Sequence, residues 1–449
     1  MDLNNFKQKL FNKGREYGLQ DMELFNNSSK SFDLRVFEQE IDHYAINEDE
    51  GISFRAVFDD KIGYAYTEKL DQDSIDFLLK DVKQNANIID KKEEKIYNGS
   101  NNYRKLNKYA PALNNIESKD KIELVKSLEQ AAFDKDDRVT AVNHCVYSDL
   151  EFKNSITNSK GLDLSFKNNI AYLYISVVAK DSGDVKTAFK FDLTQDFNEF
   201  DPKQLAGEAV EEAVSLFGAE SLPSDKYPVI LRHDVAAKML STFSSTLSAE
   251  KVQKGMSLFK GKLGEKVASK KVTIVDDPFL DKGFCSTPFD GEGVATYKKN
   301  IVDNGNLTTY LHNLKTADKA ETKSTGNAYR GSHKSYIDIA PTNMYLKPGM
   351  KSYQELIKSI DKGVIIINVQ GLHAGANPVS GDFSLSASGY VIENGAIARP
   401  VEQITIAGNF IDLLKDIEEL GRDLRMNLPG SSHIGAPSLK IKALDIAGE

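Results

Sequence analysis

The pattern that most restricts the fold is an alternation of apolar and polar residues that reverses at tight turns. Residues 52–58 alternate with a period of two, and residues 62–66 do the same after a polar turn. Two further reversals are Asn304-Gly305 and Asn394-Gly395, each placed between apolar runs. Both central residues of a type I′ turn need positive φ, which Asn and Gly adopt readily. The sequence therefore predicts antiparallel hairpins in both halves of the chain.

Helical patterns occur between these strands without a regular order. Apolar residues recur at helical spacing in 3–11, 75–89 and 122–132, and a polar stretch at 91–115 predicts a long connection. Strands and helices do not alternate regularly, which disfavours a doubly wound parallel sheet. We therefore predict an α+β fold made of two mixed helix and antiparallel-sheet domains.

A break between the two halves lies at residues 218–228. This stretch contains two prolines and a polar centre, which is typical of a linker. The chain has 449 residues, whereas one domain usually has about 100–200. We predict an N-terminal α+β domain at residues 1–222 and a strand-rich C-terminal domain at residues 228–449.

Charge and hydropathy argue against several classes of protein. The net charge is -9, and the acidic and basic residues are interleaved, without the basic stripe of a nucleic-acid binder. No apolar run approaches the ~20 residues of a membrane helix. The first residues lack the basic-then-apolar order of a signal peptide. Cys145 and Cys285 lie far apart, which fits a reducing compartment. The sequence predicts a cytoplasmic protein that binds neither nucleic acid nor membranes.

One segment, the glycine-rich loop at residues 371–383, gathers potential binding groups between two strand patterns. It contains three glycines together with His373, Asn377, Ser380 and Asp382. Glycine allows the backbone to approach a ligand closely, so these four residues are candidates for peptide binding in an inter-domain or inter-subunit cavity. The alternative is a tight polar loop that only joins two strands.

Other patterns for catalysis are weak. The seven histidines include no pair at the spacing of His-Glu-x-x-His, and there is no P-loop or nucleophile elbow. Asp276-Asp277-Pro278 follows an apolar strand pattern. Paired carboxylates can transfer protons or hold a metal. Before a proline they more often cap a turn, and we favour that interpretation.

The order of several short motifs resembles the TldD/PmbA family. In the second half the matching stretches are 261–265, 275–278, 289–293, 303–305, 325–328, 371–383, 392–395 and 405–409. In the first half they are 51–66 and 154–161. The resemblance covers nearly the whole chain, and it rests on the order of the motifs because no single one is decisive.

The resemblance also implies a subunit type. The TldD type of this family holds a zinc ion with His-Glu-x-x-x-His on a helix and a cysteine near the C-terminus, and the PmbA (TldE) type lacks them. Here the corresponding positions are His233, Asp234 and Lys238, and residues 427–436 contain no cysteine. A protonated lysine has no lone pair for zinc, and a catalytic zinc needs three protein ligands. The resemblance therefore implies a PmbA (TldE)-type chain with no zinc, no other cofactor and no catalytic residue of its own.

The implied function is that of the non-catalytic subunit of a cytoplasmic metallopeptidase, acting in peptide proteolysis or in maturation of modified peptides. Such a chain would be inactive alone and active with a zinc-bearing TldD-type partner, as a heterodimer, or it would pair with itself. Two alternatives remain. One is a homodimeric peptide-binding or scaffold protein without catalysis, and the other is a hydrolase that uses His373, Ser380 and Asp382.

Overall fold

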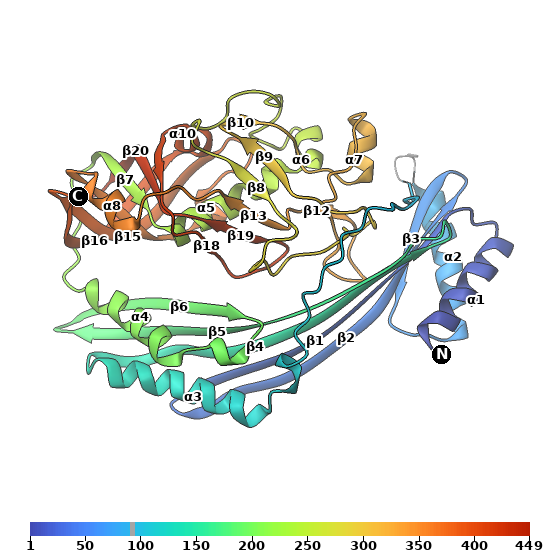
Figure 1. Cartoon of the computed structure of the whole chain (residues 1–449), viewed down its shortest axis with the longest axis horizontal. Helices are drawn as coiled ribbons and strands as arrows, with labels where there is room; N and C mark the ends of the chain where they lie inside the picture. The colour runs from blue at the N-terminus through green and yellow to red at the C-terminus, as the bar shows by residue number, and fades with distance from the viewer. Residues whose placement is uncertain (90–94) are drawn as a thin grey trace.

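The structure, a computed structural model, describes residues 1–89 and 95–449 and consists of one long curved sheet with a second, strand-rich half above it (Figure 1). The first sheet has the order β3-β2-β1-β4-β5-β6, and all neighbouring strands in it are antiparallel. Its strands are β1 (Met22–Phe37), β2 (Glu40–Phe58), β3 (Lys61–Thr67), β4 (Val139–Asn158), β5 (Asp163–Asp181) and β6 (Asp184–Thr194).

Four helices cover one face of the first sheet and leave the other face to the second half (Figure 1). They are α1 (Leu3–Glu16), α2 (Gln72–Ile88), α3 (Ser118–Lys135) and α4 (Pro202–Ser215). Successive side chains of a strand point to opposite faces. On β1, Leu24 and Leu34 therefore pack under the helices, while Phe25 and Asn27 point toward the second half.

The second half contains a closed sheet. The order β16-β15-β14-β7-β20-β17 is closed by a further pairing of β16 with β20. All pairs in it are antiparallel except β14 with β7. Its strands are β7 (Asp225–Leu231), β14 (Lys362–Gln370), β15 (Asp382–Glu393), β16 (Ala396–Asn409), β17 (Ile417–Leu420) and β20 (Leu439–Ala447).

A second sheet packs against the closed one, with the order β10-β9-β8-β13-β19-β18. It comprises β8 (Ile274–Asp276), β9 (Lys299–Asp303), β10 (Asn306–Leu307), β13 (Asn343–Leu346), β18 (Arg425–Met426) and β19 (His433–Ala436). β11 (Ala328–Tyr329) and β12 (Asp338–Ile339) form a separate pair. The helices are α5 (His233–Ser244), α6 (Ala249–Gln253), α7 (Leu314–Lys319), α8 (Tyr353–Lys358), α9 (Leu372–Gly375) and α10 (Phe410–Lys415). α5 is central, and its Leu240 and Phe243 lie in the core that both sheets share.

The predicted α+β fold and its hairpins are confirmed. β2 and β3 pair around a turn at Asp59 and Asp60, where φ is 50° and 60°. Asn304 and Asn394 adopt φ of 48° and 52° ahead of glycines that also have positive φ, and they connect β9 to β10 and β15 to β16. Two parallel pairings, β7 with β14 and β13 with β19, add to the predicted antiparallel ones.

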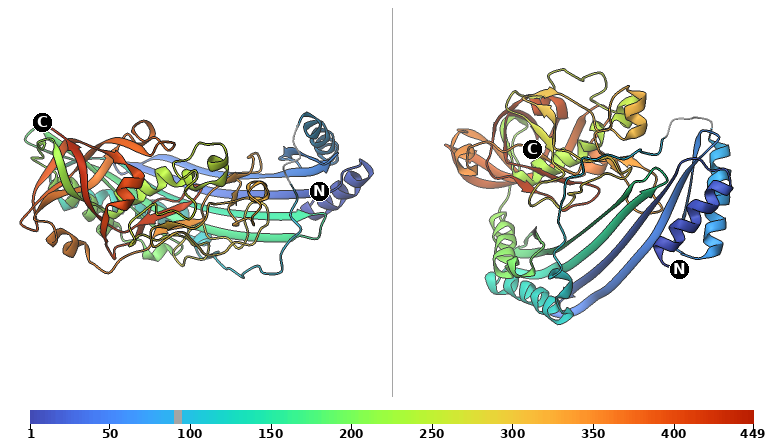
Figure 2. Two further views of the ribbon diagram at one scale, coloured as in Figure 1. Left: turned by 90° about the horizontal axis from the view of Figure 1, so that it is seen from above. Right: turned by 45° about the vertical axis from the view of Figure 1, so that its right-hand side comes forward.

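Other local predictions differ from the structure. The apolar pattern at 409–422 predicts one helix, but α10 ends at Lys415 and β17 follows. Of the predicted connection at 91–115, residues 91–94 lie outside the described residues. The chain crosses between the halves at residues 216–224, between α4 and β7, which overlaps the stretch predicted as a linker at 218–228. The domain boundaries themselves stay a prediction. The two termini lie at opposite ends of the long axis (Figure 2).

Candidate functional site

Helix α5 carries the positions at which the resemblance places the zinc ligands of the TldD type, and it begins where the two halves meet. Arg232, just before the helix, donates hydrogen bonds to both carboxylate oxygens of Asp234, at 2.8 and 2.6 Å. The same guanidinium donates to Glu212 of α4, which also accepts a hydrogen bond from Lys190 of β6. Asp234 is therefore part of an ion-pair network that joins α5 to the first half.

The side chains at the start of α5 do not fit a zinc ion. Burial alone would raise the pKa of Asp234, but the hydrogen bonds and charge of Arg232 outweigh it and hold this pKa at about 2. Burial lowers the pKa of Lys238. His233 faces Asp423 through Nδ1, at 3.4 Å. Arg232 and Lys238 are cations and repel a metal ion. Of positions 233, 234 and 238, only 233 carries an imidazole, whereas a catalytic zinc needs three protein ligands.

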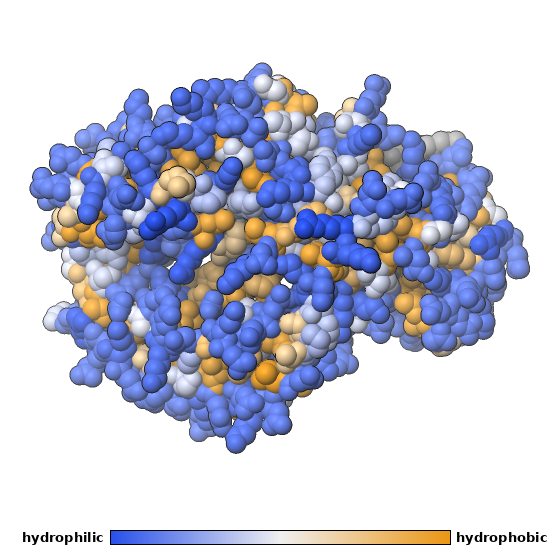
Figure 3. Space-filling model, in the orientation of Figure 1, coloured by the Kyte–Doolittle hydropathy of each residue, from blue (hydrophilic) through white to orange (hydrophobic). Residues whose placement is uncertain are grey.

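A cavity of about 400 Å³ lies between the first sheet and the second half. Aromatic rings and amides line much of it, including Phe25, Asn27, Phe152, Asn154, Phe166 and Phe289. In Figure 3, hydrophobic residues gather in the furrow where the two halves meet. A concave volume of a few hundred Å³ with an apolar lining and a few polar groups is typical of a ligand site.

A buried ion-pair cluster fixes one wall of this cavity. Arg330, which lines the cavity from the second half, donates to Glu23 on β1 and, at 3.2 Å, to the hydroxyl of Ser53 on β2. Glu23 also accepts two hydrogen bonds from Arg55, at 3.1 and 3.0 Å. The three charged side chains are no more than 4% exposed. Because charge-assisted hydrogen bonds are strong and directional, the cluster holds the two halves together beside the cavity.

The motif at 289–293 anchors the same wall with two buried carboxyl groups. Asp290 accepts hydrogen bonds from three backbone N–H groups, those of Glu292, Val294 and Ala328, at 2.9–3.0 Å. Glu292 accepts one from the backbone N–H of Leu314, at 2.7 Å, where α7 begins. Burial, followed by the nearby charge of Asp290, raises the pKa of Glu292. The motif therefore organises loops and holds no free carboxylate pair.

Asp276 and Asp277 also have structural roles, but different ones. Asp277 accepts a hydrogen bond from the backbone N–H of Phe279 at 3.0 Å, which is the turn cap that we favoured. Asp276 is fully buried and accepts hydrogen bonds from Lys299 at 2.9 Å and from Asn327 at 2.8 Å. These bonds connect the motifs at 275–278 and 325–328 to Lys299 on β9, a role that the sequence pattern did not indicate.

The four residues predicted for peptide binding do not line this cavity. His373 is exposed on α9. Asn377 accepts a hydrogen bond from the backbone N–H of Ser380, whose hydroxyl accepts one from the backbone N–H of Asp382, both at 3.3 Å. The amide of Asn409 donates to Asp382 at 2.9 Å, and this bond lowers the pKa of Asp382. These bonds lie within the loop and its neighbour, as the alternative of a tight polar loop expects. Peptide binding by the glycine-rich loop stays a prediction.

No sequence pattern indicated Arg330 as a residue of the cavity wall or Glu23 as its buried partner. Glu23 and Ser53, the partners of Arg330, are 307 and 277 residues away in the chain. A usable hint was the motif at 325–328, which ends two residues before Arg330. Only the fold brings β1, β2 and this loop together.

Three family models match successive parts of the chain. They are PmbA/TldA metallopeptidase domain 1 at residues 23–86, the central domain at 111–217 and the C-terminal domain at 224–448. The chain belongs to the PmbA/TldD metallopeptidase family. The resemblance predicted from the order of short motifs is thereby confirmed.

Several relatives and solved structures are similar to this chain. A metalloprotease of Methanothermobacter thermautotrophicus is 30% identical over 290 residues, which is 63% of this chain and 63% of that protein, so the match spans less than two thirds of either. A crystal structure from Thermotoga maritima, described as a proposed modulator of a DNA gyrase, is 36% identical with a TM-score of 0.92, covering 99% of this chain and 100% of that one. TldE from Thermococcus kodakarensis has the same fold, with a TM-score of 0.90 at 24% identity and coverage of 99% and 100%.

Among residues 1–89 and 95–449, no helix is long and apolar enough to cross a membrane.

Proposed function

We propose that this chain is the PmbA (TldE)-type subunit, without a catalytic zinc on α5, of a cytoplasmic two-subunit metallopeptidase. In this proposal a TldD-type partner carries the zinc and the hydrolytic chemistry, and this chain binds part of the peptide. The substrates are peptides that are degraded or matured. The chain is inactive alone.

The observation that carries the proposal is the set of bonds that the side chains at the start of α5 form. Asp234, where the TldD type has the glutamate of its motif, is bound by Arg232 at both oxygens. Lys238, where that type has its second histidine, is half-buried, and its ammonium donates a hydrogen bond to Oδ1 of Asn368 at 3.4 Å. A general base must be free to take a proton, and a zinc ligand must offer a lone pair. Neither side chain can meet these needs while it stays in this network.

The chemistry of the cavity supports the part of the proposal that concerns the peptide. Aromatic rings such as Phe152 and Phe166 can pack against apolar side chains of a peptide. The amide of Asn27 donates to Asn154 at 2.8 Å. Each amide can form further hydrogen bonds, so the pair can serve a peptide backbone, which needs both donors and acceptors.

A reconstitution experiment tests the proposal. The chain is purified alone and mixed with a TldD-type subunit, and each sample is assayed for peptide cleavage and for mass by light scattering. We expect no cleavage by the chain alone and cleavage by the mixture, with a complex heavier than the 49.8 kDa single chain. Phe152→Ala, in the cavity, should reduce cleavage, and Phe77→Ala, on the exposed face of α2, should not.

Three results would count against this function. Cleavage by the chain alone that disappears with His233→Ala would show a working metal site on α5. Self-association without any binding to a TldD-type subunit would favour the homodimeric peptide-binding protein. Equal effects of the two phenylalanine substitutions would remove the cavity from the peptide-binding role.

A further inference from the structure

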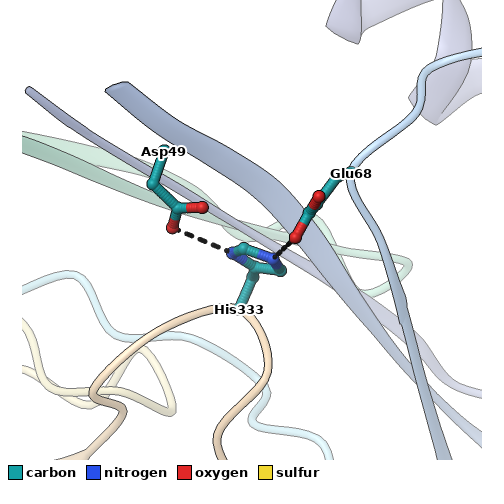
Figure 4. A group of neighbouring side chains, drawn as sticks. All are labelled: Asp49, Glu68 and His333. Carbon is teal, nitrogen blue, oxygen red and sulfur yellow. Dashed lines mark ion pairs between the residues drawn. The ribbon is translucent and has the colours of Figure 1, made fainter. Parts of the chain in front are cut away.

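Another group of potential metal ligands lies where a loop of the second half contacts the first sheet (Figure 4). His333 is in the loop between β11 and β12 and is completely buried. Its ring lies flat against the backbone of β2, since a Cβ added at Gly51 would be 2.4 Å from it. In the part of the chain that the structure describes, neither Nδ1 nor Nε2 of this ring has a hydrogen-bond partner. A buried polar atom without a partner destabilises the folded state unless a ligand supplies one.

Two carboxylates face the two sides of this ring. Oδ2 of Asp49, on β2, lies 3.8 Å from Nδ1, and Oε1 of Glu68, just after β3, lies 3.6 Å from Nε2. Both distances are too long for hydrogen bonds. One ligand atom from each of Asp49, Glu68 and His333 can be chosen so that all three lie within 4.8 Å of one another.

We propose that Asp49, Glu68 and His333 bind a divalent metal ion of the zinc type. The ion takes one ring nitrogen and one oxygen from each carboxylate. Zinc ligands lie at about 2.0–2.2 Å from the metal, so ligand atoms around a tetrahedral ion are about 3.4 Å apart. The separations here are somewhat longer, and Asp49 and Glu68, whose side chains are 50% and 52% exposed, have the freedom to close them. An imidazole in the ligand set favours zinc over calcium and magnesium.

The surroundings hold the imidazole in place and leave the carboxylates adjustable. The hydroxyl of Tyr64 donates to the backbone carbonyl of His333, and the edge of the Tyr66 ring packs near the imidazole, with centroids 6.1 Å apart. Glu68 is paired with the ammonium of Lys334, which is about half exposed. A metal ion must displace this ammonium, and an exposed lysine can swing into solvent at little cost.

The location gives the ion a task that differs from hydrolysis. Asp49 and Glu68 belong to the first half and His333 to the second, so a bound ion ties the halves together. Asp49 also lines the cavity. Three protein ligands leave one coordination position for water or another group. The prediction of a chain without a cofactor came from residues 233–238 and a missing cysteine, and no sequence pattern links residues 49, 68 and 333.

Metal titration of the full-length chain tests the proposal. The protein is stripped with a chelator and titrated with Zn²⁺ by calorimetry, with Co²⁺ by visible absorption and with Mg²⁺ for comparison. We expect about one equivalent of Zn²⁺ or Co²⁺ and no comparable uptake of Mg²⁺. Asp49→Asn and Glu68→Gln should weaken binding at least about tenfold, since even residues that only support a metal ligand contribute 10–100-fold. Lys334→Met should tighten it.

Matched variants show where the ion binds. Glu48→Gln also removes one negative charge, but Glu48 is the neighbour of Asp49 and points to the opposite face of β2. It should leave metal binding unchanged. His233→Gln should also leave it unchanged. Because a ligand that binds only the folded state stabilises it, Zn²⁺ should raise the melting temperature of the parent chain more than that of Asp49→Asn.

Several outcomes overturn the proposal. The unmodified chain could take up no Zn²⁺, or Asp49→Asn and Glu68→Gln could bind as the parent does. In either case His333 is an imidazole held between two carboxylates and nothing more. Uptake lost with His233→Gln instead places the ion on α5, which contradicts the proposed function as well. The peptidase assay of the mixed subunits tests that function independently of this site.

Discussion

Replacing Glu23 with glutamine should weaken the contact between the two halves of the chain. Glu23 is fully buried and accepts hydrogen bonds from both Arg55 and Arg330. A neutral amide in its place leaves two buried guanidinium groups without this carboxylate and turns an N–H₂ toward their donors. Breaking a buried ion pair by removing one partner costs about 3–5 kcal/mol. Since natural domains have about 5–15 kcal/mol of stability, this is a large fraction of the total.

Urea unfolding of three variants measures this effect. Glu23→Gln should lower the free energy of unfolding by about 3–5 kcal/mol. Arg330→Met should cost less, because Glu23 and Arg55 keep their paired hydrogen bonds. Glu48→Gln breaks an ion pair with Lys30 whose side chains are 68% and 59% exposed, and it should have little effect on the free energy of unfolding, because water screens exposed ion pairs. If Glu23→Gln costs no more than Glu48→Gln, the cluster does not stabilise the junction and the reasoning from burial is wrong.

Three further predictions concern single groups. Burial raises the pKa of Glu292, so the stability that its protonated form contributes is complete in acid and is lost as the pH rises through its folded pKa. Glu292→Gln should remove this loss. If the free energy of unfolding of Glu292→Gln depends on pH as that of the parent does, the prediction is wrong. Burial raises the pKa of Cys145 and raises that of Cys285 to about 12, so Cys145 should react with a thiol reagent only after unfolding. Cys285, which lines the cavity, should react slowly with the thiol reagent, and more slowly still when peptide is bound. A labelling rate that does not change when peptide is added would argue against peptide binding in the cavity. Asn377→Ala and Asp382→Ala should reduce cleavage by the mixed subunits while circular dichroism shows a folded chain, and normal cleavage by both would leave the glycine-rich loop a structural one.

The hairpins could be predicted because their information is local. Asn304-Gly305 and Asn394-Gly395 specify positive φ within two residues, whatever lies around them. The length of the strands could not be predicted in the same way. Residues 139–147 and 150–156 have the pattern of two strands, since Ser148 and Asp149 interrupt the apolar alternation, yet both runs belong to β4.

The interruption in β4 is resolved by partners from distant segments. The hydroxyl of Ser148 donates to Asp33 on β1 at 2.7 Å, and Lys121 on α3 donates to Asp149 at 2.5 Å. A polar side chain in a strand is tolerated when it is hydrogen-bonded, but a single sequence does not show which distant residue supplies the bond. The same limit applies to Glu23 and Arg330, and so the cavity wall could not be inferred before the fold was known.

At the junction of the two halves, the side chains at the start of α5 form bonds that differ from those of a metal site. In a metal site, the side chains at the start of this helix must point to one ion and stay free of other bonds. Here Arg232 binds Asp234 and Glu212 at once, so the same positions connect α5 to α4 and hold the second half against the first. Restoring a histidine at Lys238 would supply a ligand but would leave Arg232 bound to Asp234, and a guanidinium beside a zinc ion opposes its binding. The ion-pair network therefore serves domain contact and opposes a metal ion at the same positions, which supports the proposed division of labour in which a partner subunit carries the chemistry.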